Sequence, residues 1–190
     1  MLEPEYIRQI LKAHPPISLE RNNFRHAAVL MPIFWCEGEP YLVFTKRSEK
    51  VPHHKGQISF PGGSIDVGDV DSWAAAVRET TEEIGLPAGQ IQYLGRLDDI
   101  MTITGYVISP FVAQIPDHFA YQISDFEIDV LFEAPLRELT DPSRLREEIA
   151  IFEQKSYPIY YFEYQQHIIW GATGKILHQF LEITGLISAS

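Results

Sequence analysis

The chain has 190 residues, 45% of them hydrophobic and 22% charged, and its formal net charge is −11. This length and composition predict one soluble globular domain over residues 1–190, and the acidic charge disfavours a general nucleic-acid binder, which needs a basic surface. No apolar run approaches about eighteen residues, which predicts that no segment spans a membrane. The single cysteine, Cys36, and the lack of an apolar export signal predict a cytoplasmic protein without an internal disulfide.

The first part of the chain predicts a helix, a strand hairpin and a long loop. Apolar residues at helical spacing predict a leading helix over about residues 4–13. The runs 26–35 and 40–47, rich in β-branched and aromatic residues, flank the turn sequence CEGE and predict a hairpin. Residues 48–69 are rich in Gly, Pro and polar residues and predict a long loop around one short strand. Loops of this length inside a compact domain tend to be functional.

A second helix is predicted from about Ser72 to Ile84. Asp71 or Ser72 would cap its N-terminus, and Gly85 would end it. Further strands are expected in the segments 91–100, 105–115, 127–136, 158–164 and 167–170, followed by a helix over 171–185. Strands interleaved with a few helices predict an α/β or α+β sandwich, in which a mixed β-sheet packs between helices.

The second helix carries a cluster of like charges, Glu79, Glu82 and Glu83. Each pair at helical spacing costs about 0.2–0.5 kcal/mol. At 100° per residue the glutamates lie about 140–240° from Val77, so we expect the helix to pack through its Val77 side and to present the carboxylates opposite. A solvated acidic face is the alternative interpretation. No lysine at i+4 relieves the charge, and oxygen ligands suit Mg²⁺, which favours a preformed metal site.

The stretch GGSIDVGDVDSWAAAVRETTEEIGL resembles the signature of the Nudix hydrolases. That signature is Gly, five residues, Glu, seven residues, then Arg-Glu-apolar-any-Glu-Glu-any-Gly-apolar. Its second half matches at Arg78, Glu79, Glu82, Glu83, Gly85 and Leu86. Its first half departs by one inserted residue: counted back from Arg78, the expected Glu falls on Val70, and counted forward from Gly63, the acidic position falls on Asp69. The role of Asp69 is therefore open.

The insertion is shared with the Nudix subgroup that hydrolyses coenzyme A, which also carries an upstream motif. This chain matches that motif at Thr45, Arg47, Ser48, Gly56, Phe60, Pro61, Gly62, Gly63 and Asp66. The second Arg of the motif falls on Pro52, which leaves that contact unsupported. The motif region spans about residues 45–86, and the resemblance as a whole covers about residues 24–180.

The resemblance implies a Nudix fold and a site that binds Mg²⁺ or Mn²⁺. Glu79, Glu82 and Glu83 would be the metal ligands, directly or through water, and the Gly62 carbonyl could join them. The general base would be Glu127, which opens the expected strand 127–136, or Glu79. An exposed acid at a strand edge is the alternative interpretation of Glu127. Structural support would come from Arg78, Gly63 and Gly85.

The basic segment before the signature contains Lys46, Arg47, Lys50 and Lys55, with His53 and His54 beside them. Lys46, Arg47 and Lys55 would bind the 3′-phosphate of coenzyme A, although ordinary surface charge is an alternative explanation. The implied reaction is hydrolysis of the diphosphate of coenzyme A or its thioesters to 3′,5′-ADP and a 4′-phosphopantetheine product. The alternatives are another nucleoside diphosphate, such as ADP-ribose or a nicotinamide dinucleotide, and a non-catalytic nucleotide-binding module. No nucleic-acid or membrane partner is expected, and the oligomeric state is not predicted.

Overall fold

The computed structural model describes residues 2–20, 23–51, 55–152 and 154–188, so Pro52, His53 and His54 lie outside the described residues. Its helices are α1 (Pro4–Ala13), α2 (Ser72–Ile84), α3 (Leu136–Leu139) and α4 (Gly171–Ile183), with short 3-10 helices η1 (Ala88–Gln90) and η2 (Pro142–Arg144). Its strands are β1 (Arg25–Cys36), β2 (Glu39–Arg47), β3 (Ile58–Ser59), β4 (Gly62–Ser64), β5 (Gln92–Arg96), β6 (Ile100–Met101), β7 (Tyr106–Gln114), β8 (Ile128–Pro135), β9 (Leu145–Phe152), β10 (Lys155–Tyr164) and β11 (His167–Ile169). Within this part of the chain, every helix is too short or too polar to cross a membrane.

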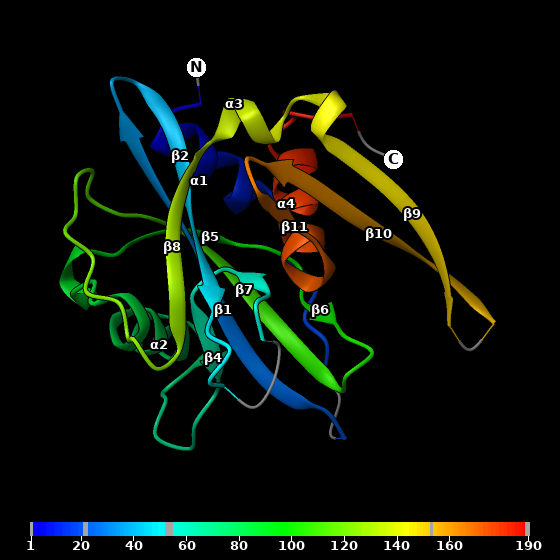
Figure 1. Cartoon of the computed structure of the whole chain (residues 1–190), viewed down its shortest axis with the longest axis horizontal. Coiled ribbons are helices and arrows are strands. Elements are labelled where there is room, and N and C mark those ends of the chain that lie inside the picture. The colour runs from blue at the N-terminus through cyan, green and yellow to red at the C-terminus, as the bar shows by residue number, and fades with distance from the viewer. Residues whose placement is uncertain (1, 21–22, 52–54, 153, 189–190) are drawn as a thin grey trace.

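β1 lies at the centre of a mixed sheet (Figure 1). The sheet has the strand order β3-β2-β1-β7-β5, to which β4, β6 and β8 add by pairing with β1, β7 and β2 respectively. β7 runs parallel to β1, and the pairings of β1 with β2 and β4 are antiparallel. The predicted mixed sheet and α+β class are therefore confirmed.

Side chains alternate between the two faces of the central sheet along each strand. Both faces are covered by other elements. On one face, Ala28, Leu30 and Val43 form a core cluster with Ala75 and Ala76 of α2. The other face packs on α1 and α4 through a larger cluster that includes Ile7, Leu11, Met31, Ile33, Leu42, Phe44, Leu177 and Phe180. Figure 1 shows α2 and α4 on opposite sides of β1 and β2.

A second sheet has the order β11-β10-β9, of which the sequence predicted only the pair of strands over 158–164 and 167–170. β10 and β11 occupy the two segments expected to pair, but β9 was missed because its first half, Leu145–Glu148, carries three consecutive charged residues. Phe162 of β10 packs with α4, while the far end of the β9–β10 hairpin projects from the body of the molecule (Figure 1).

The ends of α2 are as predicted, but its buried face is so only in part. The Asp71 side chain accepts a hydrogen bond from the Ala74 N–H at 2.8 Å, and Gly85 ends the helix at φ 74°. The buried positions include Ala75, Ala76 and Glu83, whereas Val77 is only half-buried. Thr80 and Ile84, on the Val77 side, are buried as predicted, and Val77 packs at the border of the core. The prediction that all three glutamates face outward is wrong, because the buried face also includes Glu83. The two small alanines let the backbone of α2 approach the sheet closely, which turns Glu83 inward.

Candidate active site

Glu83 is a buried carboxylate at the end of α2 that faces the sheet, with 3% of the residue exposed. Its Oε2 accepts a hydrogen bond from the Gly62 N–H at 3.2 Å, and its Oε1 lies 3.6 Å from Nη1 of Arg47. Burial raises the pKa of Glu83 to about 8, although the Gly62 hydrogen bond and Arg47 both act to lower it. A carboxylate that is costly to ionise in this place would be stabilised by a cation.

The Gly62 N–H reaches Glu83 because β4 lies directly against β1. Gly62 has φ 150°, and a Cβ at this position would lie 2.3 Å from the carbonyl oxygen of Ala28. Only glycine fits this close approach without displacing the backbone. The Gly62 N–H donates to Glu83, and the role of the Gly62 carbonyl as a metal ligand stays a prediction.

Glu79 lies one turn before Glu83 and is also mostly buried. A Cβ on Gly63 would come within 2.5 Å of the Glu79 carboxyl carbon, so the missing side chain of Gly63 makes room for this carboxylate. Burial raises the pKa of Glu79, the hydrogen bond from Arg78 opposes that shift, and the charges of Glu82 and Glu127 add to it. The FPGG motif therefore supplies an N–H to one glutamate and space to the other.

Arg78 ties α2 to the loop before it. Its Nε and Nη2 donate to the two carboxylate oxygens of Asp69, each at 3.0 Å, and Nη2 also donates to the Ser64 carbonyl at 3.1 Å. Its Nη1 donates to Glu79 at 2.8 Å and to Glu82 at 3.3 Å. The Arg78 hydrogen bonds hold the pKa of Asp69 below its usual value. Asp69, whose role the inserted residue left open, is thus the loop's anchor for Arg78.

Glu127 lies in the turn before β8, where its carbonyl accepts the Ser48 N–H at 2.8 Å. This bond joins the start of the loop after β2 to the start of β8. The charge of Glu127 raises the pKa of both Glu79 and Glu83, so the three carboxylates interact although Glu127 is more than forty residues away in sequence. The fold therefore brings the charge of Glu127 within electrostatic reach of Glu79 and Glu83.

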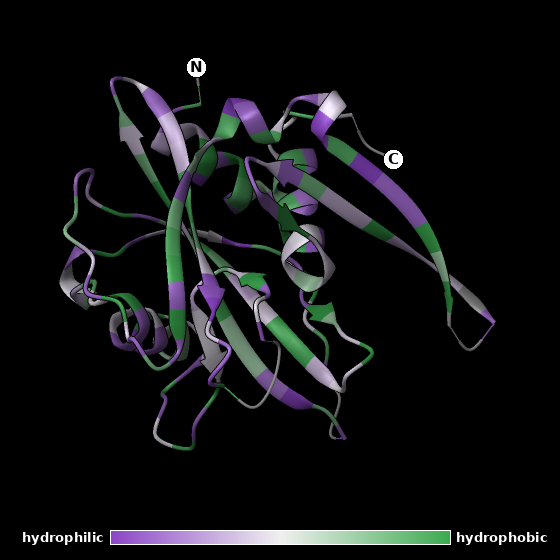
Figure 2. Cartoon of the chain, viewed as in Figure 1, coloured by the Kyte–Doolittle hydropathy of each residue, from purple (hydrophilic) through white to green (hydrophobic). Residues whose placement is uncertain are grey.

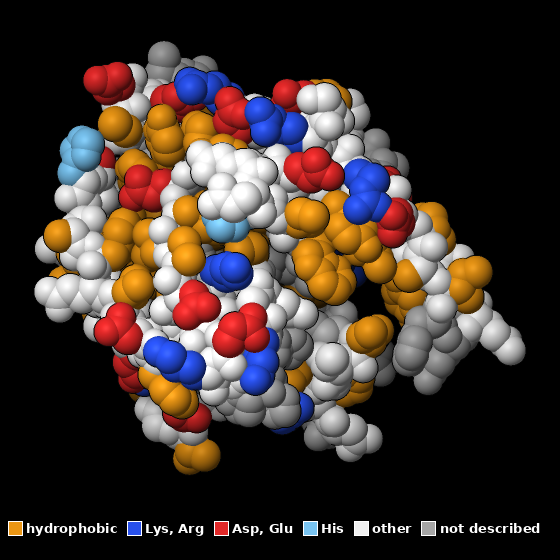
Figure 3. All heavy atoms as spheres, viewed as in Figure 1, with side chains coloured by type: hydrophobic (Ala, Val, Ile, Leu, Met, Phe, Trp, Pro, Cys, Tyr) orange, Lys and Arg blue, Asp and Glu red, His pale blue; other side chains and the backbone are white. Residues whose placement is uncertain are grey.

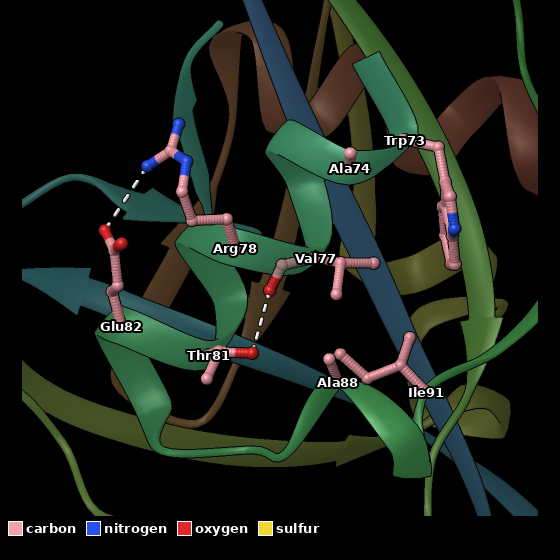
Figure 4. Close-up of a pocket in the computed structure, with 8 residues that line it drawn as sticks. All are labelled: Trp73, Ala74, Val77, Arg78, Thr81, Glu82, Ala88 and Ile91. Atoms are coloured by element: carbon pink, nitrogen blue, oxygen red, sulfur yellow. Dashed lines mark hydrogen bonds and ion pairs between the residues drawn. The ribbon is translucent and has the colours of Figure 1, made fainter. Parts of the chain in front are cut away.

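Glu82 is the most exposed of the three helix glutamates, and it shares Arg78 and an electrostatic interaction with Glu79. Its side chain is 61% exposed and is directed toward Arg78 (Figure 4). It borders a shallow pocket on the outer side of α2, lined by Trp73, Ala74, Val77, Arg78, Thr81, Glu82, Ala88 and Ile91. Val77, expected on the packed side of the helix, thus borders this pocket as well as the core.

The donor set fits a hard divalent cation. Among the described residues, no group of three or more His, Cys, Asp or Glu side chains is arranged to enclose a metal ion by itself. Mg²⁺ is commonly held by one or two carboxylates together with waters and substrate phosphates rather than by a protein cage. Glu79, which is half-buried, and Glu83, which is buried, lie one helical turn apart and have raised pKa values, so they provide such a pair.

The basic segment does not form one cluster in the described residues. Arg47 points to the α2 face and lies near Glu83, whereas Lys46 belongs to the other face, where its charge acts on His167 of β11. Lys50 donates to the Asp125 carbonyl at 2.9 Å, and Lys55 is exposed in a turn. The Arg47–Glu83 contact was not predicted, because no local pattern links two residues on separate elements.

Sequence comparisons give a consistent family. The family model of the NUDIX domain matches residues 24–160. A protein of Photorhabdus laumondii described as an uncharacterized Nudix hydrolase, NudL, is 38% identical over 165 residues, which cover 87% of each chain. The NudL protein of Escherichia coli K12, described in the same words, is 33% identical over 175 residues, covering 92% of this chain and 91% of its own.

Solved structures share the fold. An Ap4A hydrolase of C. elegans, solved as a binary complex, has a TM-score of 0.51 at 23% identity and covers 58% of this chain and 80% of its own. The Nudix hydrolase RenU of M. smegmatis has a TM-score of 0.52 at 21% identity, covering 62% of this chain and 74% of its own. At these identities the likeness concerns the fold alone.

Proposed function

Because the chain belongs to the Nudix family and is a hydrolase of diphosphate bonds, we propose that its substrate is coenzyme A or a coenzyme A thioester. The products would be 3′,5′-ADP and a 4′-phosphopantetheine product. The observation that carries the reaction is the pair formed by the half-buried Glu79 and the buried Glu83, with the cationic side chain of Arg47 beside Glu83. We expect the enzyme to act in the cytoplasm.

Nudix hydrolases in general need a divalent metal ion, and we assign Mg²⁺ or Mn²⁺ to Glu79 and Glu83, with Glu82 in reach through water. When bound, such an ion neutralises charge on the diphosphate and lowers the pKa of a water. The chain's own residues prepare this site. Gly62 and Arg47 hold Glu83 in place, and Arg78 holds Glu79.

A general base must lie within hydrogen-bond reach of the attacking water. Glu127 is our candidate, because its charge acts on both Glu79 and Glu83 and its backbone is fixed by the bond to Ser48. Glu79 is the alternative base. Replacing each by Gln separates the two, because loss of the base lowers turnover without changing the metal concentration needed for half-maximal activity.

The preference for coenzyme A rests on the motif that runs from Thr45 to Asp66. One observation favours a second candidate, another nucleoside diphosphate such as ADP-ribose or a nicotinamide dinucleotide. Lys46 and Arg47 lie on opposite faces of the central sheet, so the described basic side chains do not gather into one site for an extra phosphate.

The experiment is a substrate panel. The purified protein is assayed with coenzyme A, 3′-dephospho-coenzyme A, ADP-ribose and a nicotinamide dinucleotide, each with Mg²⁺, with Mn²⁺ and with a chelator. We expect metal-dependent hydrolysis with the highest kcat/KM for coenzyme A, and products separated by chromatography as the two phosphate monoesters. If kcat/KM were highest for ADP-ribose or for the dinucleotide, the second candidate would replace coenzyme A as the proposed substrate.

The panel needs two control variants. Glu83→Gln removes one carboxylate charge from the site and should abolish the hydrolysis, which excludes a contaminating enzyme. Glu5→Gln removes the same charge from the exposed face of α1 and should leave the hydrolysis unchanged. If neither metal supported hydrolysis of any diphosphate by the folded protein, the proposed reaction would be wrong.

A further inference from the structure

β9 is the long free edge of the second sheet. β10 pairs with it from Leu145 to Phe152, and within the described residues no further strand pairs with its outer side. The opposite edge of the sheet, β11, is only three residues long. A free edge presents unpaired N–H and C=O groups, which form a template for another strand.

The outer half of β9 lacks the features that usually protect an edge. Proteins cover free edges with lysines, prolines or bulges, but Ile149, Ala150 and Ile151 carry no charge, and the pairing with β10 runs without a bulge. Ile149 is 61% exposed and Ile151 is 78% exposed, on the same face of the strand. Figure 2 shows β9 changing from purple to green along its length, and Figure 3 shows hydrophobic side chains on the projecting hairpin.

That exposed face continues a core face. Leu145 lies opposite Phe162 and packs against the core that includes α4. Ile149 and Ile151 follow at even spacing on the same side of β9, but they lie in the part of the hairpin that projects from the body (Figure 1). Ile149 and Ile151 are therefore large apolar side chains that the described part of the chain leaves exposed.

We propose that β9 pairs with β9 of a second copy of this chain, antiparallel and about a twofold axis at Ile149. The pairing would join the two three-stranded sheets into one. In a symmetric antiparallel pair, residues opposite each other have a constant sum of residue numbers, and a twofold axis perpendicular to the sheet requires that sum to be even. Ile149 then faces itself, Glu147 faces Ile151, and Glu148 faces Ala150.

Charge excludes two of the alternative registers. A pairing centred on Glu147 or Glu148 would place two carboxylates directly opposite each other, which is destabilising, in a protein whose net charge is already −11. Centring on Ile149 places each acidic half of β9 against the apolar half of the other copy. The same register brings the exposed Ile149 and Ile151 of both copies together on one face of the joined sheet, and this apolar contact favours a second copy of the chain as the partner.

The dimer should be weak. A single strand pair buries less surface than the roughly 1,200–2,000 Å² of a standard stable interface. We therefore expect a monomer–dimer equilibrium in the micromolar range, visible in sedimentation velocity as a weight-average mass that rises with protein concentration.

Two substitutions on β9 test the register. Ile149→Glu places like charges opposite each other at the axis and should weaken the dimer at least about tenfold, since like charges are destabilising in cross-strand pairs. Ile151→Lys faces Glu147 of the other copy and should preserve dimerisation or strengthen it. Ile168→Glu, an equally drastic change at an exposed position of β11, is the control and should not alter the equilibrium. Circular dichroism and thermal melting check that each variant folds.

Cross-linking provides an independent measurement. The chain has one cysteine, so Cys36→Ser gives a cysteine-free background. In that background Ile149→Cys should form a disulfide between copies under mild oxidation, because facing strand residues lie within disulfide range. Glu147→Cys, which would face Ile151, should not. A wild-type chain that stays monomeric across the micromolar range, or a dimer that survives Ile149→Glu, would overturn the proposal.

Discussion

The two faces of the central sheet are built from the same strands but carry different kinds of contact. The α2 face holds buried or half-buried charges with specific partners: Arg78 joins Asp69 to Glu79 by hydrogen bonds, and Glu83 is bonded to the Gly62 N–H and paired with Arg47. The α4 face is apolar packing, in which Leu177 is fully buried. Buried charges need specific partners, whereas apolar packing needs only area and shape. We therefore expect the α2 face to carry the reaction and the α4 face to contribute mainly to the stability of the fold.

Neighbouring residues of β2 belong to different faces of the sheet. Arg47 reaches Glu83 on the α2 face, and its neighbour Lys46 acts on His167 on the α4 face. Adjacent residues of a strand point in opposite directions, so two cations that look alike in the sequence have different surroundings. Five variants, with two controls, test the contrast between the faces.

The largest effect is expected from Glu83→Gln. It keeps the size of the side chain but removes the charge from the proposed metal site, and we expect turnover at saturating Mg²⁺ to fall at least about a hundredfold, or about 2.7 kcal/mol. Steady-state kinetics measure this loss, with the melting temperature as a check on folding. Turnover near that of the wild type would mean that the buried carboxylate has no part in the reaction.

Leu177→Ala makes the opposite change on the α4 face. Truncating a fully buried leucine costs about 2–5 kcal/mol of unfolding free energy, and Leu177 is 0% exposed. We expect chemical denaturation to show a loss of that size while kcat/KM of the folded enzyme stays within a few-fold. Ile17→Ala, at an exposed position, is the control and should change neither. A large loss of kcat/KM in folded Leu177→Ala would show that the two faces are coupled.

Arg47→Ala and Lys46→Ala compare the two faces within one dipeptide. Arg47 forms an ion pair with Glu83 at 3.6 Å, so its loss leaves a buried carboxylate without its cation. We expect kcat/KM to fall at least about tenfold, or about 1.4 kcal/mol. Because Arg47 faces Glu83, kcat/KM should fall by the same factor for coenzyme A and for its 3′-dephospho form. Lys46→Ala should have a smaller effect. A loss confined to coenzyme A would instead assign Arg47 to the 3′-phosphate.

The smallest effect is expected from Asp69→Asn, and it should depend on pH. The Arg78 hydrogen bonds lower the pKa of Asp69 from its usual 3.8. A carboxyl whose folded pKa is lowered contributes stability above its unfolded pKa, and that contribution is lost as the pH falls through the folded value. The melting temperature of Asp69→Asn should therefore lie slightly below the wild type at neutral pH, and the gap should close below about pH 4.

Asp66→Asn is the control for that pH profile. Asp66 is exposed, and its Oδ2 lies 3.6 Å from Nη2 of Arg78, so this ion pair is looser than that of Asp69. The melting temperature of Asp66→Asn should therefore equal that of the wild type across the pH range. A gap for Asp69→Asn that stayed constant into acid would mean that the substitution acts through packing rather than through the charge.

Local features of the fold could be predicted from the sequence because they depend on neighbouring residues. The ends of α2 depend on the Asp71 cap and on Gly85, whose positive φ suits glycine, and both were predicted. The buried side of α2 could be found only in part in the same way. Ala75 and Ala76 have little apolar surface, so a pattern based on large side chains selected the Val77 side and left Glu83 outside the buried face.

The sequence by itself therefore determined the mixed α+β class, the family and the acidic helix with its glycine-rich loop. Only the tertiary structure decided which charges interact. The charge of Glu127 acts on Glu79 and Glu83, and Arg47 reaches Glu83, because separate elements pack on the same face of the sheet. The free edge of β9 was likewise invisible in the sequence, because strand pairing depends on which other strands lie within hydrogen-bond distance. Contacts between distant residues follow from packing, and no local pattern encodes them.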